Sequence, residues 1–205
     1  MESETKIEGF KLDVLREVAN IGAGHAASAL SQIMTDCRVM ISVPDVKALR
    51  ADALLKLFGG PDTVIVAALM RILGDLPGRT ALVMSEESAK LLCDFMIGRA
   101  PGTTTELEEL ERSTLAEAGN IIGSAYLNAL SDLLDMMLLP SVPTLVIDKP
   151  ANLVAQLDLE TEQTVLCAST AFKFPDGEPE RTLNGQFLHL PEPASLKALF
   201  DAIDR

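Results

Sequence analysis

Residues 12–31 read LDVLREVANIGAGHAASALS, and residues 112–131 read RSTLAEAGNIIGSAYLNALS. At a constant offset of 100 positions, seven residues are identical: Leu15, Glu17, Asn20, Ile21, Ala29, Leu30 and Ser31 recur as Leu115, Glu117, Asn120, Ile121, Ala129, Leu130 and Ser131. Such self-similarity at a fixed period indicates an internal duplication. Because no Gly/Ser/Pro-rich linker separates the halves, we expect one domain over residues 1–205. It would consist of two pseudo-repeats, at about 1–100 and 101–205.

The first copy has the periodicity of an amphipathic helix. On a helical wheel its apolar and small residues, among them Leu15, Val18 and Gly22, fall in one arc. Asp13, Glu17 and Asn20 lie together on the opposite face, since residues three or four apart are neighbours on a helix surface. The second copy repeats this arrangement with Ser113, Glu117 and Asn120.

Two glycines interrupt the first helix, at a cost of roughly 1 kcal/mol each relative to alanine. Gly22 lies on the apolar face, where close helix packing explains it. Gly24 lies beside the polar group, where a small residue would let the backbone of a partner approach closely. The polar group also has a plain alternative interpretation, because exposed polar residues on a helix need no function. Its occurrence twice at identical spacing favours a function.

The rest of the chain predicts an α+β fold with a pseudo-twofold internal duplication. We expect an antiparallel-rich sheet flanked by the two long motif-bearing helices. The junction between the halves is expected at PGTTTEL (101–107). The overlapping stretch TTTELEEL (103–110) also predicts a helix start with a threonine cap. The other elements expected are strands at 39–46, 64–73, 80–85, 141–148, 152–160, 163–174 and 182–190, and helices at 51–58, 85–98 and 193–203.

Composition and charge exclude several functional classes. There are 30 acidic and 17 basic residues, and the net charge of −13 argues against nucleic acid or an anionic membrane as a partner. No apolar run reaches the ~20 residues of a membrane span, and the polar N-terminus lacks a signal-peptide core. We therefore expect a soluble cytoplasmic protein.

The inventory of cysteine and histidine argues against a metal centre or a histidine-based triad. Cys37, Cys93 and Cys167 are widely spaced and form no CxxC pair, so we expect buried structural thiols. The chain has two histidines, His25 and His189. A zinc site is not expected.

A glutamate and an asparagine on one rigid helix face can still support catalysis. A carboxamide can hold and orient a water molecule, although it is a poor base. A glutamate can form an ion pair with a lysine or arginine of a partner. Together these groups suit docking into another protein's site, where the asparagine aligns water with a labile phosphoryl group.

These residues resemble the motif of the CheC/CheX/FliY family of chemotaxis phosphatases, which reads D/S-x3-E-x2-N and is followed about 22 residues later by proline. In the second copy, 22 residues separate Asn120 from Pro143, and in the first copy 23 separate Asn20 from Pro44. The first copy therefore has one residue more than the second between its asparagine and its proline. Two complete motifs distinguish the chain from single-motif members.

The resemblance implies a phosphatase, a hydrolase that removes the phosphoryl group from the phospho-aspartate of the response regulator CheY. It implies that Asn20 and Asn120 each orient the hydrolytic water. It implies that Glu17 and Glu117 each pair with the lysine of the regulator's active site.

The resemblance also implies supporting or docking roles for Asp13, Ser113, Gly24, Pro44 and Pro143. The protein would need no cofactor or metal of its own, because Mg²⁺ would belong to the regulator. CheD, the receptor-modifying deamidase, is implied as a second partner that raises the activity.

Two other functions stay open from the sequence. The chain could be a non-catalytic adaptor that binds CheD or a phosphorylated response regulator. It could also be a structural module whose motifs have decayed, although two intact copies argue against that. Since the duplication already supplies both halves, we expect a monomer when the protein is free.

Overall fold

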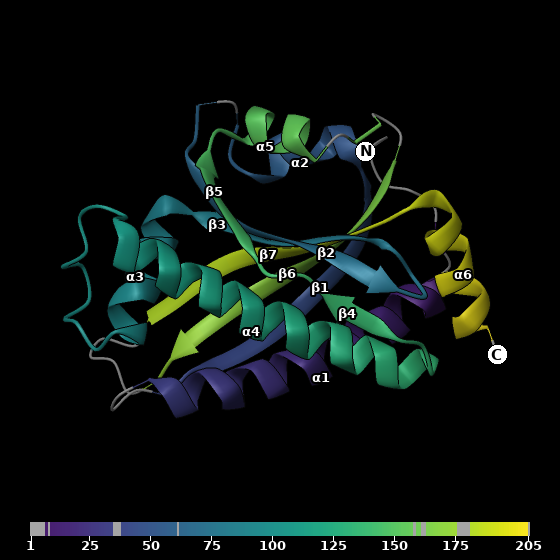
Figure 1. Cartoon of the computed structure of the whole chain (residues 1–205), viewed down its shortest axis with the longest axis horizontal. Coiled ribbons are helices and arrows are strands. Elements are labelled where there is room, and N and C mark those ends of the chain that lie inside the picture. The colour runs from purple at the N-terminus through teal and green to yellow at the C-terminus, as the bar shows by residue number, and fades with distance from the viewer. Residues whose placement is uncertain are drawn as a thin grey trace.

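The structure is a computed structural model that describes residues 7, 9–34, 38–60, 62–157, 159–160, 163–175 and 181–204; within β1 it does not describe the side chain of Pro44. Its centre is a curved seven-stranded sheet in which every pairing is antiparallel (Figure 1). The strands are β1 (Met40–Arg50), β2 (Ile65–Gly74), β3 (Gly78–Ser85), β4 (Leu138–Pro140), β5 (Thr144–Asp148), β6 (Thr164–Phe174) and β7 (Arg181–Pro191).

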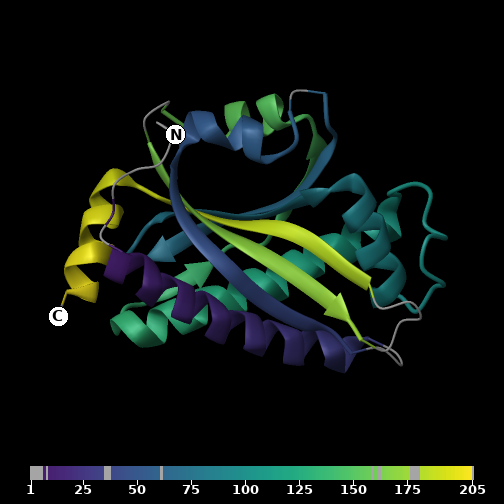
Figure 2. The same cartoon turned by 180° about the vertical axis from the view of Figure 1, so that it is seen from behind.

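The two long helices cover one face of this sheet side by side, with α3 and α6 near its ends (Figures 1 and 2). The opposite face carries a smaller layer of two short helices preceded by a 3₁₀ turn. The elements of both layers are α1 (Gly9–Ile33), η1 (Ala51–Ala53), α2 (Leu54–Leu57), α3 (Glu86–Met96), α4 (Glu109–Leu134), α5 (Pro150–Gln156) and α6 (Pro193–Ile203).

Each face of the sheet has its own hydrophobic core. The larger core lies under α1 and α4, where side chains such as Leu15, Leu127 and Phe172 are fully buried. The smaller core lies under α2 and α5, around Leu54 and Leu153. The sheet order β1-β6-β7-β3-β2-β4, with β5 also paired to β2, interleaves strands from the two sequence halves. Both halves therefore contribute to one continuous sheet.

Gly22 of α1 permits a close crossing with α4. A Cβ added to Gly22 would lie 2.8 Å from the Cα of Tyr126 and 3.2 Å from the carbonyl oxygen of Ala125. This confirms the expectation that Gly22 serves helix packing. Gly24 is exposed, and a Cβ added there would meet nothing within 4 Å.

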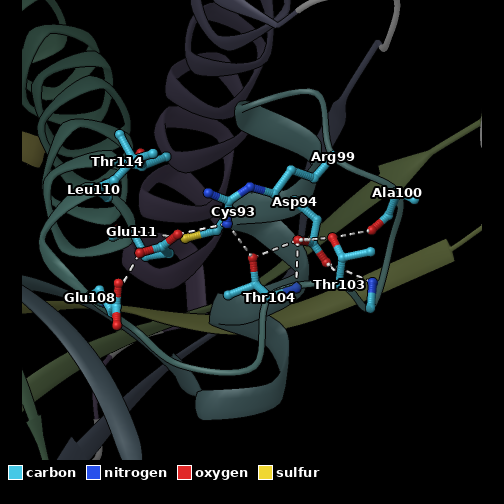
Figure 3. Close-up of polar contacts among 11 residues, drawn as sticks. Cys93, Asp94, Arg99, Ala100, Thr103, Thr104, Glu108, Leu110, Glu111 and Thr114 are labelled. Atoms are coloured by element: carbon cyan, nitrogen blue, oxygen red, sulfur yellow. Dashed lines mark hydrogen bonds and ion pairs between the residues drawn. The ribbon is translucent and has the colours of Figure 1, made fainter.

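A buried carboxylate organises the junction between the two halves, drawn in Figure 3. Asp94 is completely buried and accepts hydrogen bonds from the backbone N–H groups of Gly102 (2.6 Å), Thr103 (3.1 Å) and Thr104 (3.0 Å). The hydroxyls of Thr103 and Thr104 also donate to it, at 3.2 and 2.6 Å. Burial opposes ionisation, but these hydrogen bonds outweigh it and lower the pKa of Asp94.

The predicted threonine cap for the second long helix is wrong. α4 begins at Glu109, and Glu108 is its N-cap in a capping box with Glu111 (Figure 3). The Glu111 carboxylate also forms a 2.7 Å ion pair with Arg99. The threonines at this junction are instead engaged by Asp94, which lies too far away in the sequence for a local capping pattern to reveal it.

The predicted strand at 152–160 is also wrong, because residues 150–156 form helix α5. Pro150 occupies the first helical turn, where its missing N–H costs no hydrogen bond. Leu153 and Leu157 are four residues apart and almost completely buried, which is a helical spacing rather than the alternation of a strand. The short strand β4 was not predicted, and the strand expected at 141–148 begins at Thr144; the other strands and helices overlap their expected ranges.

Candidate active site

The second motif lies on the surface of α4. Ser113 and Glu117 are exposed and Asn120 is half-buried, and their spacings of four and three residues align them along one face. The opposite face of this part of the helix is buried in the larger core, with Leu115, Ala118, Gly119 and Ile122. The amphipathic sequence of α4 therefore fixes which way the motif points.

An open pocket of about 440 Å³ brings the second motif together with the segment after α4. One wall is Ser113, Ala116, Glu117 and Asn120 of α4, and the other is the segment 140–143, which reads PSVP. Pro143 thus lies beside the motif, although 22 residues separate it from Asn120. The structure brings Ser113, Glu117, Asn120 and Pro143 together around this pocket.

The wall 140–143 is attached firmly to the sheet. Pro140 lies opposite Ile72 of β2 in the β4 ladder. The Ser141 N–H donates to the Arg71 carbonyl oxygen at 2.9 Å, and the Arg71 N–H donates to the Ser141 hydroxyl oxygen at 2.9 Å. The next residue, Val142, is 86% exposed. The hydrogen bonds of Ser141 therefore hold an apolar side chain at the rim of the pocket.

Asn120 has no side-chain hydrogen bond to any residue that the structure describes. A carboxamide offers two donor hydrogens and an acceptor oxygen. In this pocket all of them are available to water or to a partner. Asn120 lines the same pocket as Glu117 and the wall 140–143, so its carboxamide can hold a small molecule within this pocket.

The first motif lies on the corresponding face of α1. Asp13, Glu17 and Asn20 are exposed, and Gly24 is exposed one turn further on. Asp13 forms a 2.9 Å ion pair with Arg16 of the same helix. The structure thus places these four residues on one surface, as the helical wheel predicts.

The two asparagines differ in their surroundings. The Val43 N–H donates to the Asn20 Oδ1 at 3.0 Å, and Asn20 Nδ2 donates to the carbonyl oxygens of Val43 (3.3 Å) and Arg16 (3.0 Å). We call the paired contact between the Asn20 side chain and the Val43 backbone the Asn20–Val43 clasp. Asn20 therefore has a structural role that Asn120 lacks.

A bulge in β1 explains the clasp. The register between β1 and β6 shifts between Ser42 and Asp45, so that Val43 and Pro44 lie opposite the single residue Thr170. Proline has no N–H to donate to a ladder. The backbone groups of Val43 leave the ladder at this point, and Asn20 satisfies them. The backbone of Pro44 lies in this bulge, and its side chain lies outside the described part of the structure.

The described thiols are buried, as expected from the sequence. Burial raises the pKa of both Cys93 and Cys167 to about 12, so each is a neutral thiol. Cys37 lies outside the described residues. Within the described ranges, there is no group of three or more His, Cys, Asp or Glu side chains that could hold a metal ion. No helix in those ranges is long and apolar enough to span a membrane.

Comparison with known proteins agrees with this geometry. The model of the CheC-like family matches residues 10–48 and 110–147, which contain the two motif helices and the prolines that follow them. The CheY-P phosphatase CheC of Bacillus subtilis is 33% identical over 203 residues, covering 96% of this chain and 95% of that protein. The chain belongs to the CheC-like family. By this relationship it is a phosphatase, which is a hydrolase.

Solved structures show the same fold for this CheC-like chain. FliY of Thermotoga maritima superposes with a TM-score of 0.79 at 22% identity, covering 97% of this chain and 98% of that one. A chain of the FliG–FliM complex from H. pylori superposes with a TM-score of 0.69 at 16% identity, covering 93% and 100%. These likenesses confirm the α+β class and the antiparallel sheet.

The sequence did not reveal the difference between the two motifs of this CheC-like chain. Two residues create it: the backbone of Val43 pairs with the Asn20 side chain, and Ser141 bonds to the Arg71 backbone through its own N–H and its hydroxyl. One available signal was the additional residue before Pro44, since a proline inside a strand often marks a bulge. The attachment of Ser141 to Arg71 spans 70 residues, and no local pattern encodes it.

Proposed function

We propose that the chain hydrolyses the phospho-aspartate of a CheY-type response regulator, with Asn120 orienting the attacking water. The observation that carries this proposal is the unpaired Asn120 carboxamide in an open pocket beside Glu117. The B. subtilis relative is named for activity on CheY-P, which supports the same substrate here.

Hydrolysis of a phospho-aspartate requires mainly that the enzyme position the attacking water. Phosphoryl transfer passes through a loose transition state, so alignment of water with the phosphorus atom dominates the rate. The leaving group is a carboxylate, which needs no general acid. An amide can hold the water in line through its oxygen and N–H groups without acting as a base.

Glu117 supplies the electrostatic contact in this proposal. It is exposed, one helical turn before Asn120, on the same wall of the pocket. We assign it an ion pair with the lysine of the regulator's active site, which would fix the distance between Asn120 and the phosphoryl group. Ser113, one turn earlier, and Pro143, on the facing wall, support this docking geometry. Mg²⁺ belongs to the regulator.

The first motif contributes less in this proposal. Asn20 would have to give up its two bonds with Val43 before it could orient a water molecule. Breaking them leaves a backbone N–H and C=O of the bulge without partners, which is costly. Asp13, Glu17 and Gly24 therefore form a second docking face, and Asn20 catalyses slowly there.

Further parts of the proposal concern partners and location. The resemblance supports CheD as a second partner that stimulates the activity, and we assign no surface to it. We propose that the free protein is a monomer that acts in the cytoplasm.

Loss of the phosphoryl group from a phosphorylated CheY-type regulator tests the proposal. We expect wild-type protein to accelerate this loss and the double variant Asn20→Ala/Asn120→Ala to abolish nearly all of the acceleration. Asn128→Ala is the matched control, because Asn128 is exposed on the same helix two turns beyond Asn120. A double variant with wild-type activity would overturn the mechanism. Tight binding of the regulator without acceleration would instead identify a non-catalytic adaptor.

A further inference from the structure

A tripeptide next to the motif prolines occurs in both halves of the chain. Residues 42–44 and residues 141–143 both read Ser-Val-Pro. In the first half, Val43 is 5% exposed and packs in the larger core. In the second half, Val142 is 86% exposed, the highest fraction among the exposed large apolar side chains of the described residues. The valine of the same tripeptide is therefore buried in the first half and exposed in the second.

The fold holds the apolar side chain of Val142 in water, 86% exposed. An apolar side chain gains free energy by leaving water, and the duplicate Val43 shows that a buried arrangement of this tripeptide exists within the same chain. Val142 makes no contribution to either hydrophobic core. What distinguishes Val142 from an ordinary exposed apolar residue is that it lines the pocket of the second motif, where a docked protein would cover it.

The backbone around Val142 is stiff. Pro140 and Pro143 have fixed φ angles, and Ser141 is held to Arg71 by two hydrogen bonds of 2.9 Å. A preformed apolar contact loses little conformational entropy on binding. Such residues are good anchors for a protein partner.

The position of Val142 identifies the partner. Val142 lines the same pocket as Glu117 and Asn120. A protein that places its phospho-aspartate against Asn120 and a lysine against Glu117 must bring neighbouring surface onto Val142. The occupant is therefore the phosphorylated regulator itself, presenting an apolar surface next to its active-site lysine.

We propose that Val142 is the apolar docking contact through which the second motif pocket recognises its phosphorylated regulator. This inference rests on the proposed function of the same pocket. Val43 is buried and cannot make the equivalent contact. The apolar docking contact with the regulator is therefore confined to the second half of the chain. Val142 is a specificity-determining residue and takes no part in the chemical step.

The test compares Val142→Asp and Val142→Ala with Val64→Asp. Val64 is also exposed, at 38%, but it is not among the residues that line the second motif pocket. It immediately precedes β2. The measurements are kcat and KM with the phosphorylated regulator, and Kd for the regulator loaded with Mg²⁺ and beryllofluoride. Thermal unfolding of each variant checks the fold, which an exposed substitution should leave unchanged.

We expect Val142→Asp to raise both Kd and KM at least ~10-fold while kcat stays within about twofold of wild type, because a charge replaces the apolar contact. Val142→Ala should raise them ~3- to 10-fold, since two methyl groups are lost. Val64→Asp should change neither.

Unchanged Kd and KM in Val142→Asp, with wild-type turnover intact, would overturn the inference and leave the proposed function standing. A weaker Kd for Val142→Asp in a protein that shows no turnover would support the docking contact and contradict the phosphatase mechanism. If Val142→Asp alters self-association and leaves regulator binding unchanged, a second copy of the chain covers Val142 and the inference is wrong.

Discussion

Asn20 and Asn120 occupy the same motif position but have different hydrogen-bond partners. Asn20 is bonded to the backbone of Val43, whereas Asn120 faces an open pocket. The first asparagine therefore stabilises the fold, and the second is available for chemistry. Two asparagines at the same motif position can therefore have different roles.

Removal of each carboxamide should affect stability differently. We expect Asn20→Ala to lower the free energy of unfolding by about 1–3 kcal/mol, because the N–H and C=O of Val43 lose their partners. Asn120→Ala should change it by less than about 0.5 kcal/mol, since no described hydrogen bond is lost. Urea denaturation measures both values. Equal effects in the two variants would show that the clasp does not stabilise the protein.

His189 should make stability depend on pH. It is 2% exposed, neither ring nitrogen has a hydrogen-bond partner in the described structure, and burial lowers its pKa from 6.5 to about 4. As pH falls below 6.5, the unfolded chain takes up the proton and the folded chain does not. The free energy of unfolding should therefore fall between pH 6.5 and 4, by at most about 1.4 kcal/mol per pH unit.

The matched variant for this effect is His189→Phe, which keeps a ring in the core. The difference between wild type and His189→Phe in urea unfolding should grow from pH 7 to pH 4.5. The lowered pKa of Asp94 affects stability only at lower pH, and it is present in both proteins. A difference that stays constant with pH would contradict a neutral buried His189.

The elements of the fold illustrate what a local pattern can and cannot predict. The amphipathic period located both motif helices, and α6 begins and ends where proline and the apolar spacing predict. The pattern failed at α5, because a short apolar run has no clear period. It also failed at the α4 cap, because Asp94 engages the threonines from another element.

Two glycines of α1 provide a test at the scale of this helix. Gly22→Ala should destabilise the protein by about 1–3 kcal/mol, because the new methyl group would overlap the backbone of α4 at Tyr126. Gly24→Ala should stabilise it by up to about 1 kcal/mol, since the methyl group meets open space and alanine favours a helix. Thermal unfolding of the two variants measures both changes. Stabilisation by Gly22→Ala would contradict the close helix crossing.

At the scale of the whole molecule, the duplication gives one sheet with interleaved strands. β6 and β7 of the second half lie between β1 and β3 of the first half. The pattern of strands and helices predicted an antiparallel-rich α+β sheet, which the structure confirms. It could not predict this strand order, because pairing partners far apart in the sequence share no local signal. The different surroundings of Asn20 and Asn120 arise at the same scale, from where each Ser-Val-Pro segment meets the sheet.

The most direct test of the central claim is the rate of phosphoryl loss from a phosphorylated CheY-type regulator with each single asparagine variant. Because misplacing the attacking water costs on the order of 100-fold, we expect Asn120→Ala to lower kcat by about that factor. Asn20→Ala, assayed at a temperature where it is fully folded, should retain at least about half of the wild-type rate. The opposite pattern, with a folded Asn20→Ala nearly inactive and Asn120→Ala nearly wild type, would contradict the assignment of the active site to the second motif.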